Sequence, residues 1–163
     1  MTENLYWEEI KSGKTRNLFI ILACLFLALF AWRVSAVGFN FFPGLFLFLG
    51  LFFLIYVFNY QTLQIEITDQ TFHLKFGLVR WTSDLKNIRA CSLDDASALI
   101  KYGGAGVHFA FVNGEYRAFY NFLEFPRVLI RFINKRGPVQ ALVFSTRQPE
   151  QVLKIIQTHI NQL

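Results

Sequence analysis

The stretch that decides the fold is Leu18–Phe58, where two apolar runs follow one another almost without interruption. The first is LFIILACLFLALFAW (residues 18–32), extendable to Val37, and the second is FFPGLFLFLGLFFLIYVF (residues 41–58). As α-helices, residues 18–37 and 41–58 would be about 30 Å and about 27 Å long, close to the hydrocarbon thickness of a bilayer. Only three residues separate them. The sequence therefore predicts a transmembrane helical hairpin.

Length and composition bound what surrounds this hairpin. The chain has 163 residues, of which 54% are hydrophobic and 20 are Phe, and its formal net charge is +5. Residues 1–17 form a short N-terminal segment, residues 18–58 the hairpin, and residues 59–163 are enough for one compact domain. The excess positive charge is mild and dispersed, which suits a domain near anionic lipid headgroups and argues against nucleic acid as a partner.

The many Phe side chains of the hairpin are expected to face lipid, and a pocket for a pigment or quinone is the alternative. No His lies in either apolar run, which excludes an imidazole ligand from the hairpin. Cys24 and Cys91 give neither a disulfide framework nor metal-ligand spacing, and Gly103–Gly106 fits neither phosphate-loop pattern. We therefore expect no enzyme activity, no cofactor and no small-molecule substrate.

The charges flanking the hairpin predict its orientation. Lys11, Lys14 and Arg16 precede the first run, and several basic residues follow the second, whereas the turn side offers only Arg33. The positive-inside rule then places both termini in the cytoplasm, as in a multi-pass protein of the inner (cytoplasmic) membrane. The alternative is a cleavable signal peptide ending near Val34–Ala36. The second apolar run, which follows at once, favours the hairpin.

Aromatic and basic side chains near the ends of the two runs are candidates for anchoring at the membrane interface. In the N-terminal segment, apolar residues from Leu5 to Ile10 fit one face of a short helix, so we expect an interfacial helical segment there. A docking peptide for a partner subunit is the alternative. The expected anchors are Trp7, Trp32, Arg33, Tyr56 and Tyr60.

The remainder of the chain has the pattern of a β-rich domain. From Thr62 onward, apolar and polar residues alternate with a period of two, which is typical of strands. Asn113-Gly114 is a strong signal for a two-residue hairpin turn. An apolar stripe with helical spacing then runs through Pro149–Asn161. The pattern predicts about seven antiparallel strands in a sandwich or partly open barrel, capped by a C-terminal α-helix.

Four short sequence elements, in this order, carry a family resemblance: IEITD (65–69), LKNI (85–88), KYGGAGV (101–107) and STRQPE (145–150). Together they resemble the bacterial pleckstrin-homology-like (PH-like) domain over Leu63–Ile160. The resemblance implies a membrane α-helical hairpin followed by a mainly-β PH-like domain. It also implies a non-catalytic fold used for scaffolding or binding.

Two groups of residues in this domain are candidates for contact with lipid or a partner. The turn Thr68–Thr71 is acidic, which argues against specific binding of phosphoinositide headgroups. We expect looser contact with anionic lipid through basic side chains, and contact with a partner through exposed aromatic side chains. The basic candidates are Lys86, Arg89, Lys135 and Arg136, and the aromatic candidates are Tyr120, Phe122 and Phe125.

The function expected from these features is that of an accessory, scaffold or assembly subunit of a larger membrane complex. Its partners would be the lipid bilayer and integral membrane subunits. The alternative is an autonomous module that binds or senses lipid at the membrane surface.

Overall fold

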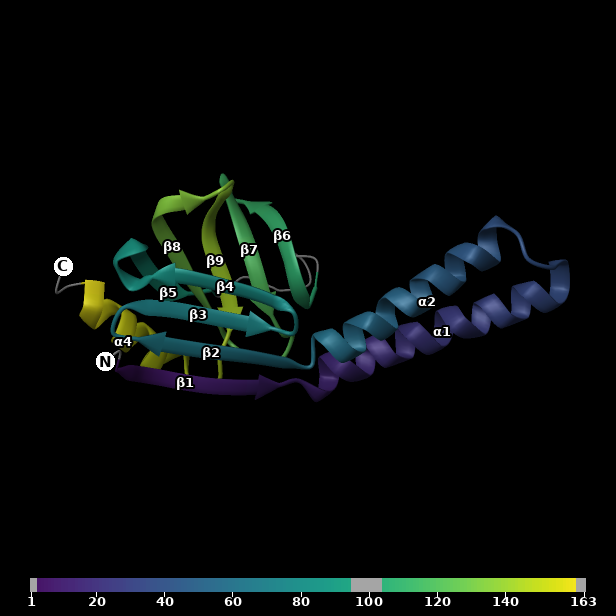
Figure 1. The fold of residues 1–163 in the computed structure, drawn as a ribbon, viewed down its shortest axis with the longest axis horizontal. Coiled ribbons are helices and arrows are strands. Elements are labelled where there is room, and N and C mark those ends of the chain that lie inside the picture. The colour runs from purple at the N-terminus through teal and green to yellow at the C-terminus, as the bar shows by residue number, and fades with distance from the viewer. Residues whose placement is uncertain (1–2, 95–103, 161–163) are drawn as a thin grey trace. The chain divides into compact units, whose positions relative to one another are not determined.

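The computed structural model describes residues 3–94 and 104–160, and the chain folds as two compact units (Figure 1). One unit is the helical segment Ser12–Gln61. The other combines residues 1–11 with residues 62–163. The helical segment is therefore an insertion within the β domain, and not a separate N-terminal extension.

Two long helices make up the helical unit. Helix α1 (Gly13–Val37) begins five residues earlier than predicted, where the Ser12 hydroxyl accepts a hydrogen bond of 2.9 Å from the backbone N–H of Thr15. Helix α2 (Phe41–Asn59) begins where the Asn40 side chain accepts a hydrogen bond of 3.1 Å from the backbone N–H of Phe42. Both helices are long and apolar enough to span a membrane.

The two helices pack along a seam with seven-residue spacing on α2. Its three buried residues are Pro43, Gly50 and Val57. At Gly50 the helices approach so closely that an added Cβ would lie 2.8 Å from Cδ2 of Leu27 on α1. A spacing of seven residues is typical of the contact line between two packed helices. The small residue at the centre of this line, Gly50, allows the two helices to approach closely.

The β unit contains two sheets. In spatial order, the four-stranded sheet consists of β1 (Asn4–Lys11), β2 (Thr62–Thr68), β3 (Thr71–Phe76) and β4 (Val79–Asp84). The five-stranded sheet consists of β5 (Ile88–Leu93), β8 (Arg127–Arg136), β9 (Val139–Ser145), β7 (Glu115–Asn121) and β6 (Gly106–Val112).

A mostly-β domain with a C-terminal helix, α4 (Pro149–Ile160), is confirmed, but two details differ from prediction. The described part contains nine strands, two more than expected. They form two separate sheets and no closed barrel, which agrees with the sandwich alternative of the prediction. The pairing of β7 with β9 is parallel, whereas all the strands were expected to be antiparallel. The predicted turn at Asn113-Gly114 is confirmed, since both residues have positive φ, 52° and 81°.

The prediction of a helix in the N-terminal segment is wrong, because this segment is strand β1. It pairs antiparallel with β2, with Trp7 opposite Glu66 and Lys11 opposite Thr62. Tyr6, Glu8 and Ile10 point inward and are buried. The helical interpretation failed because the partner strand lies beyond the hairpin, out of reach of any local sequence pattern.

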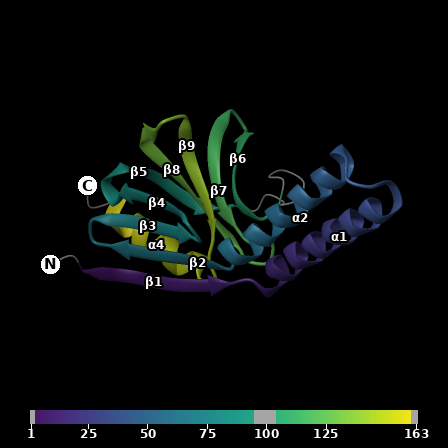
Figure 2. The ribbon, with the colours of Figure 1, turned by 45° about the vertical axis from the view of Figure 1, so that its right-hand side comes forward.

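The main core lies between the two sheets, which the views of Figures 1 and 2 show as facing layers. Phe72 and Phe144 join them with ring centroids 5.2 Å apart, and Phe76 meets Phe122, which follows β7 directly, at 4.9 Å. Helix α4 packs against β5, β8 and the short 3-10 helix η1 (Leu85–Asn87). This core fixes which side chains of each strand remain available at the surface.

Candidate functional site

The outward side of α2 carries a second apolar stripe, distinct from the seam that packs on α1. Its residues follow one another at intervals of four, three, four and three, and all are exposed: Phe41, Leu45, Phe48, Phe52 and Ile55. At 100° per residue, these five positions lie within a narrow sector roughly opposite Pro43, Gly50 and Val57. Helix α2 therefore presents one heptad-spaced seam to α1 and another to its surroundings.

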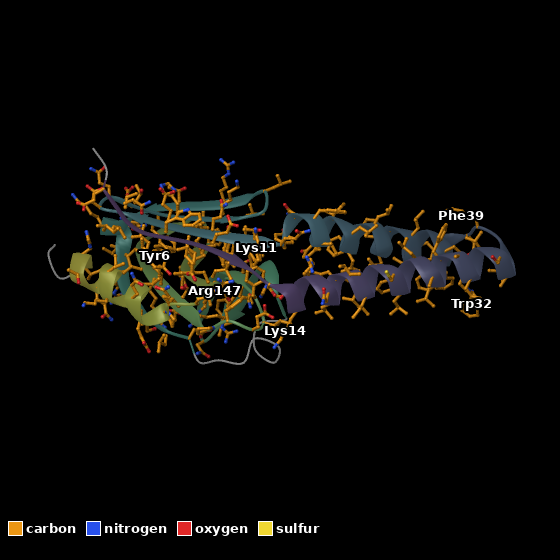
Figure 3. The ribbon with its side chains drawn as sticks, turned by 90° about the horizontal axis from the view of Figure 1, so that it is seen from below. Tyr6, Lys11, Lys14, Trp32, Phe39 and Arg147 are labelled. Atoms are coloured by element: carbon orange, nitrogen blue, oxygen red, sulfur yellow. The ribbon has the colours of Figure 1, made fainter. Side chains whose placement is uncertain are left out.

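The exposed side chains of α1 are of a different kind. Those of its central part are aliphatic, such as Ile21 and Leu25, whereas most of those on α2 are Phe. Near the end of α1, Trp32 is exposed (Figure 3). The guanidinium of Arg33 lies 5.9 Å from the centroid of the Trp32 ring. The outward surface of α2 is thus the more aromatic of the two.

The structure places the predicted interface anchors in different surroundings. Trp32 is exposed, whereas Tyr56 and Tyr60 pack on each other at 4.5 Å, with Tyr60 buried. Trp7 belongs to β1 of the β unit, where it is exposed beside a hollow of about 310 Å³. The other residues lining this hollow are mostly polar or charged: Gln64, Glu66, His73, Leu74, Lys75, Arg80 and Thr82.

Two of the predicted basic segments are brought together beside a second hollow. The Asn87 side chain donates to the backbone oxygen of Asn134 at 3.2 Å and accepts from its backbone N–H at 2.8 Å. Lys86 and Asn134 both line the adjoining hollow of about 610 Å³, which also contains Trp81 and Phe132, stacked at 5.7 Å. Sequence spacing alone does not predict this meeting of η1 with β8.

The other basic candidates are placed less specifically. Arg89 is exposed on β5, at the edge of the five-stranded sheet. The backbones of Lys135 and Arg136 lie in β8, while their side chains fall outside the described part of the chain.

The expectation that Tyr120, Phe122 and Phe125 are exposed is wrong for the first two. Tyr120 and Phe122 are fully buried, and Phe122 packs between Phe76 and Phe125. Phe125 is partly buried, with the Arg147 guanidinium 5.5 Å from its ring centroid. Buried rings of this kind stabilise the core and offer little surface to a partner.

Among the described aromatic side chains of the β unit, those that are exposed besides Trp7 are Phe109 and Phe111 on β6, at 52% and 72% exposure. The Phe109 ring stacks on that of Tyr116 with centroids 6.0 Å apart and an interplanar angle of 4°. Five consecutive residues of β7, Arg117–Asn121, are buried whichever face they occupy, so the alternation in sequence did not reveal which aromatic residues of this hairpin would be left outside the core.

A buried carboxylate that the sequence did not single out joins β1 to the start of α4. Glu8 accepts hydrogen bonds from the Tyr6 hydroxyl at 2.7 Å, the Thr146 hydroxyl at 2.6 Å and the Arg147 backbone N–H at 3.0 Å. Burial, and then the neighbouring Glu8 carboxylate, raise the pKa of Tyr6 above its ordinary value, against a lowering effect of Thr146. The network is structural in character, because Glu8 satisfies three donors of the fold.

A second ionic cluster lies on the five-stranded sheet. Glu115 accepts from Arg117 Nη2 at 2.7 Å and from Arg131 Nε at 2.8 Å, which links β7 to β8 across β9. Partial burial raises the pKa of Glu115, but the hydrogen bonds from Arg131 and Arg117 outweigh burial, so this pKa lies below its ordinary value.

Comparisons with protein families, with characterised proteins and with solved structures find no match to this chain. Within residues 3–94 and 104–160, no three His, Cys, Asp or Glu side chains lie close enough together to hold a metal ion. The surfaces described above are therefore the basis for assigning a function.

Proposed function

We propose that this chain is a non-catalytic, membrane-anchored protein with a PH-like β domain that acts as an accessory, scaffold or assembly subunit of a larger membrane complex. The observation that carries the proposal is the second heptad-spaced stripe of α2. Its five exposed side chains lie on the opposite side of the helix from the seam that packs on α1.

In a bilayer, lipid tails are as apolar as the side chains of a helix, so the hydrophobic effect does not drive two helices together. Helices associate there through close packing of their side chains. A 4-3 spacing of large side chains is the pattern that inserts between the residues of a neighbouring helix. Aromatic side chains are also enriched where proteins bind one another. These features favour an integral membrane partner that packs on Phe41, Phe48 and Phe52.

Chain topology supports a hairpin in which both helices cross the membrane. Because Lys11 pairs with Thr62, the residues before α1 and after α2 must lie on the same side. The basic residues Lys11, Lys14 and Arg16 favour the cytoplasmic side of the inner membrane for both termini. Cleavage of a signal peptide near Val34–Ala36 would remove β1, a strand of the four-stranded sheet, which argues for the uncleaved chain.

The test is to extract the native protein in mild detergent and to identify, by mass spectrometry, what remains bound after a high-salt wash. We expect integral membrane proteins at a constant ratio. The double variant Phe48→Leu/Phe52→Leu keeps the stripe apolar but removes its rings, so these partners should be lost. The matched control Ile21→Leu/Leu25→Ile changes exposed residues of α1 and should retain them.

Recovery of the chain alone would contradict the accessory role and would favour the second candidate function, autonomous binding of anionic lipid. Equal retention of partners by the α2 variant and the α1 control would contradict a partner-binding role for the stripe alone.

One observation favours that second candidate: Lys86 lines a hollow together with Trp81 and Asn134, although Asp84 also lines it. A cationic side chain near an anionic membrane surface contributes about 1 kcal/mol, and salt screens this contribution. In the detergent-solubilised full-length chain, native mass spectrometry would count bound phosphatidylglycerol and phosphatidylcholine. Lipid binding requires a preference for phosphatidylglycerol that falls with salt and with Lys86→Glu, but not with the exposed control Lys154→Glu.

A further inference from the structure

The strand β6 differs from the other three strands that end a sheet in the described part of the chain. The edge strands are β1 and β4 in one sheet and β5 and β6 in the other. Charged residues occur in β1, β4 and β5, for example Glu9, Arg80 and Arg89, whereas β6 reads GVHFAFV and contains no Asp, Glu, Lys or Arg. Charges on edge strands prevent unwanted pairing, so β6 lacks the usual protection.

The two faces of β6 are differently occupied. On one face, His108 stacks on Phe119 with ring centroids 5.0 Å apart, and Ala110 packs against the buried cluster that includes Phe119. On the other face, Phe109 and Phe111 are exposed. Pairing with β7 therefore holds β6 in place, and the rings of Phe109 and Phe111 and the outer edge of the strand remain at the surface.

The sequence of β6 is complementary to itself in one antiparallel register. Centred on Ala110, that register would place Phe109 opposite Phe111 of the second copy, and would do so twice about the two-fold axis. Aromatic cross-strand pairs stabilise a sheet, and the small Ala110 would meet its own counterpart at the axis. A register centred on Phe109 would instead pair Phe111 with Val107 and leave an aromatic ring without an aromatic partner.

We propose that the outer edge of β6 pairs with β6 of a second copy of this chain, antiparallel and centred on Ala110. The absence of charge favours a second copy as the occupant, because no like charges are opposed when the strand meets itself. This inference goes beyond the proposed function, since it uses the β domain and does not depend on the stripe of α2.

The test is disulfide formation in the full-length chain, in a background where Cys24→Ala and Cys91→Ala remove both native thiols. A disulfide requires Cβ atoms about 4 Å apart, so it reports the register directly. Under mild oxidation, Ala110→Cys alone should give a disulfide-linked dimer as the main product. Phe109→Cys and Phe111→Cys should each give little alone and a linked dimer when mixed.

The matched control is Ser92→Cys, an exposed position on the opposite edge strand β5, which should give only trace dimer. In a second measurement, Phe111→Lys places a charge on the edge at an exposed site and should reduce the number of copies of this chain in the detergent-solubilised particle from two to one, whereas Phe111→Leu should not.

No dimer from Ala110→Cys above the Ser92→Cys control would overturn the proposal. Linkage of Ala110→Cys to a different protein would assign the edge to another partner and would also overturn it. Loss of the dimer in Phe111→Lys with integral partners still bound would separate this inference from the proposed function, because the two surfaces would then act independently.

Discussion

The carboxylate of Glu8 in β1 accepts a hydrogen bond of 2.6 Å from the hydroxyl of Thr146, 138 residues further along the chain. Thr146 in turn accepts from the backbone N–H of Gln148 at 3.1 Å, immediately before α4. The contact therefore joins the first strand of one sheet to the segment that leads from the other sheet into the closing helix.

Removing this carboxylate should destabilise the β domain. Glu8→Ala would leave the donors of Tyr6, Thr146 and Arg147 without their acceptor, at an expected cost of about 3 kcal/mol in the free energy of unfolding. Chemical denaturation of the detergent-solubilised chain, followed by circular dichroism, measures the loss. Glu9→Ala, on the more exposed side of the same strand, is the control and should change little. Equal effects of the two variants would show that the Glu8 network is not stabilising.

The close approach of the helices at Gly50 predicts a position-specific effect of one methyl group. Gly50→Ala would place a Cβ 2.8 Å from Leu27 Cδ2 and 2.9 Å from its Cγ, so either the Leu27 side chain or the two helices must shift. We expect a loss of about 1–3 kcal/mol, as for other overpacked sites. At Gly44 the added Cβ would meet only Phe39 Cζ, at an ordinary 3.7 Å, so Gly44→Ala is the matched control. Thermal unfolding in detergent compares the stability of the two variants. Equal stability of Gly50→Ala and Gly44→Ala would contradict the close packing at Gly50.

The lowered pKa of Glu115 predicts a contribution to stability that depends on pH. The unfolded chain takes up this proton near the ordinary pKa of 4.5, whereas the folded chain takes it up at lower pH. The contribution is therefore fully present above the unfolded pKa and is lost as the pH falls through the folded pKa. Below about pH 5, wild type should lose stability more steeply than Glu115→Gln. The exposed control Glu3→Gln should follow wild type, and parallel curves for all three proteins would exclude a role for Glu115.

Cys91 should react slowly with alkylating reagents while the domain is folded. Burial raises its pKa to about 11, and its thiol donates to the backbone oxygen of Leu153 at 3.9 Å. Since the thiolate is the nucleophile, iodoacetamide at mildly alkaline pH should modify Cys91 much more slowly than an exposed thiol. In a Cys24→Ala background, intact-mass spectrometry measures the rate, with Ser92→Cys/Cys91→Ala as the exposed comparison. Similar rates would mean that α4 does not protect this site.

The helical hairpin could be predicted from sequence because its signal is local. Twenty or so consecutive apolar residues have few structural alternatives, and the described helices α1 and α2 contain the predicted runs. The strands with clear alternation, such as β2, and the turn at Asn113-Gly114 were predicted for the same reason. Each of these features is specified within about 20 residues.

The features that sequence reasoning missed depend on residues far apart in the chain. β1 was predicted as a helix because its apolar residues fit a helical face, and only pairing with β2 selects the strand. Tyr120 was predicted to be exposed because it lies beside the polar residues Asn121 and Glu124, and only the position of the second sheet decides that its ring is buried. The meeting of Asn87 with Asn134 likewise follows from tertiary structure alone.

The insertion of Ser12–Gln61 between two paired strands imposes an order on folding during synthesis. β1 leaves the ribosome first but has no partner until both helices and Thr62–Thr68 have been made. Packing of α1 on α2 brings Lys11 and Thr62 together, so closing this long loop costs little additional chain entropy. If the hairpin spans the membrane as proposed, a nascent chain in which only α1 crossed the bilayer would hold β1 and β2 on opposite sides and leave Glu8 away from Thr146. Completion of the β domain would therefore act as a check on insertion of the hairpin, because failed chains would retain an unpaired strand edge open to proteolysis.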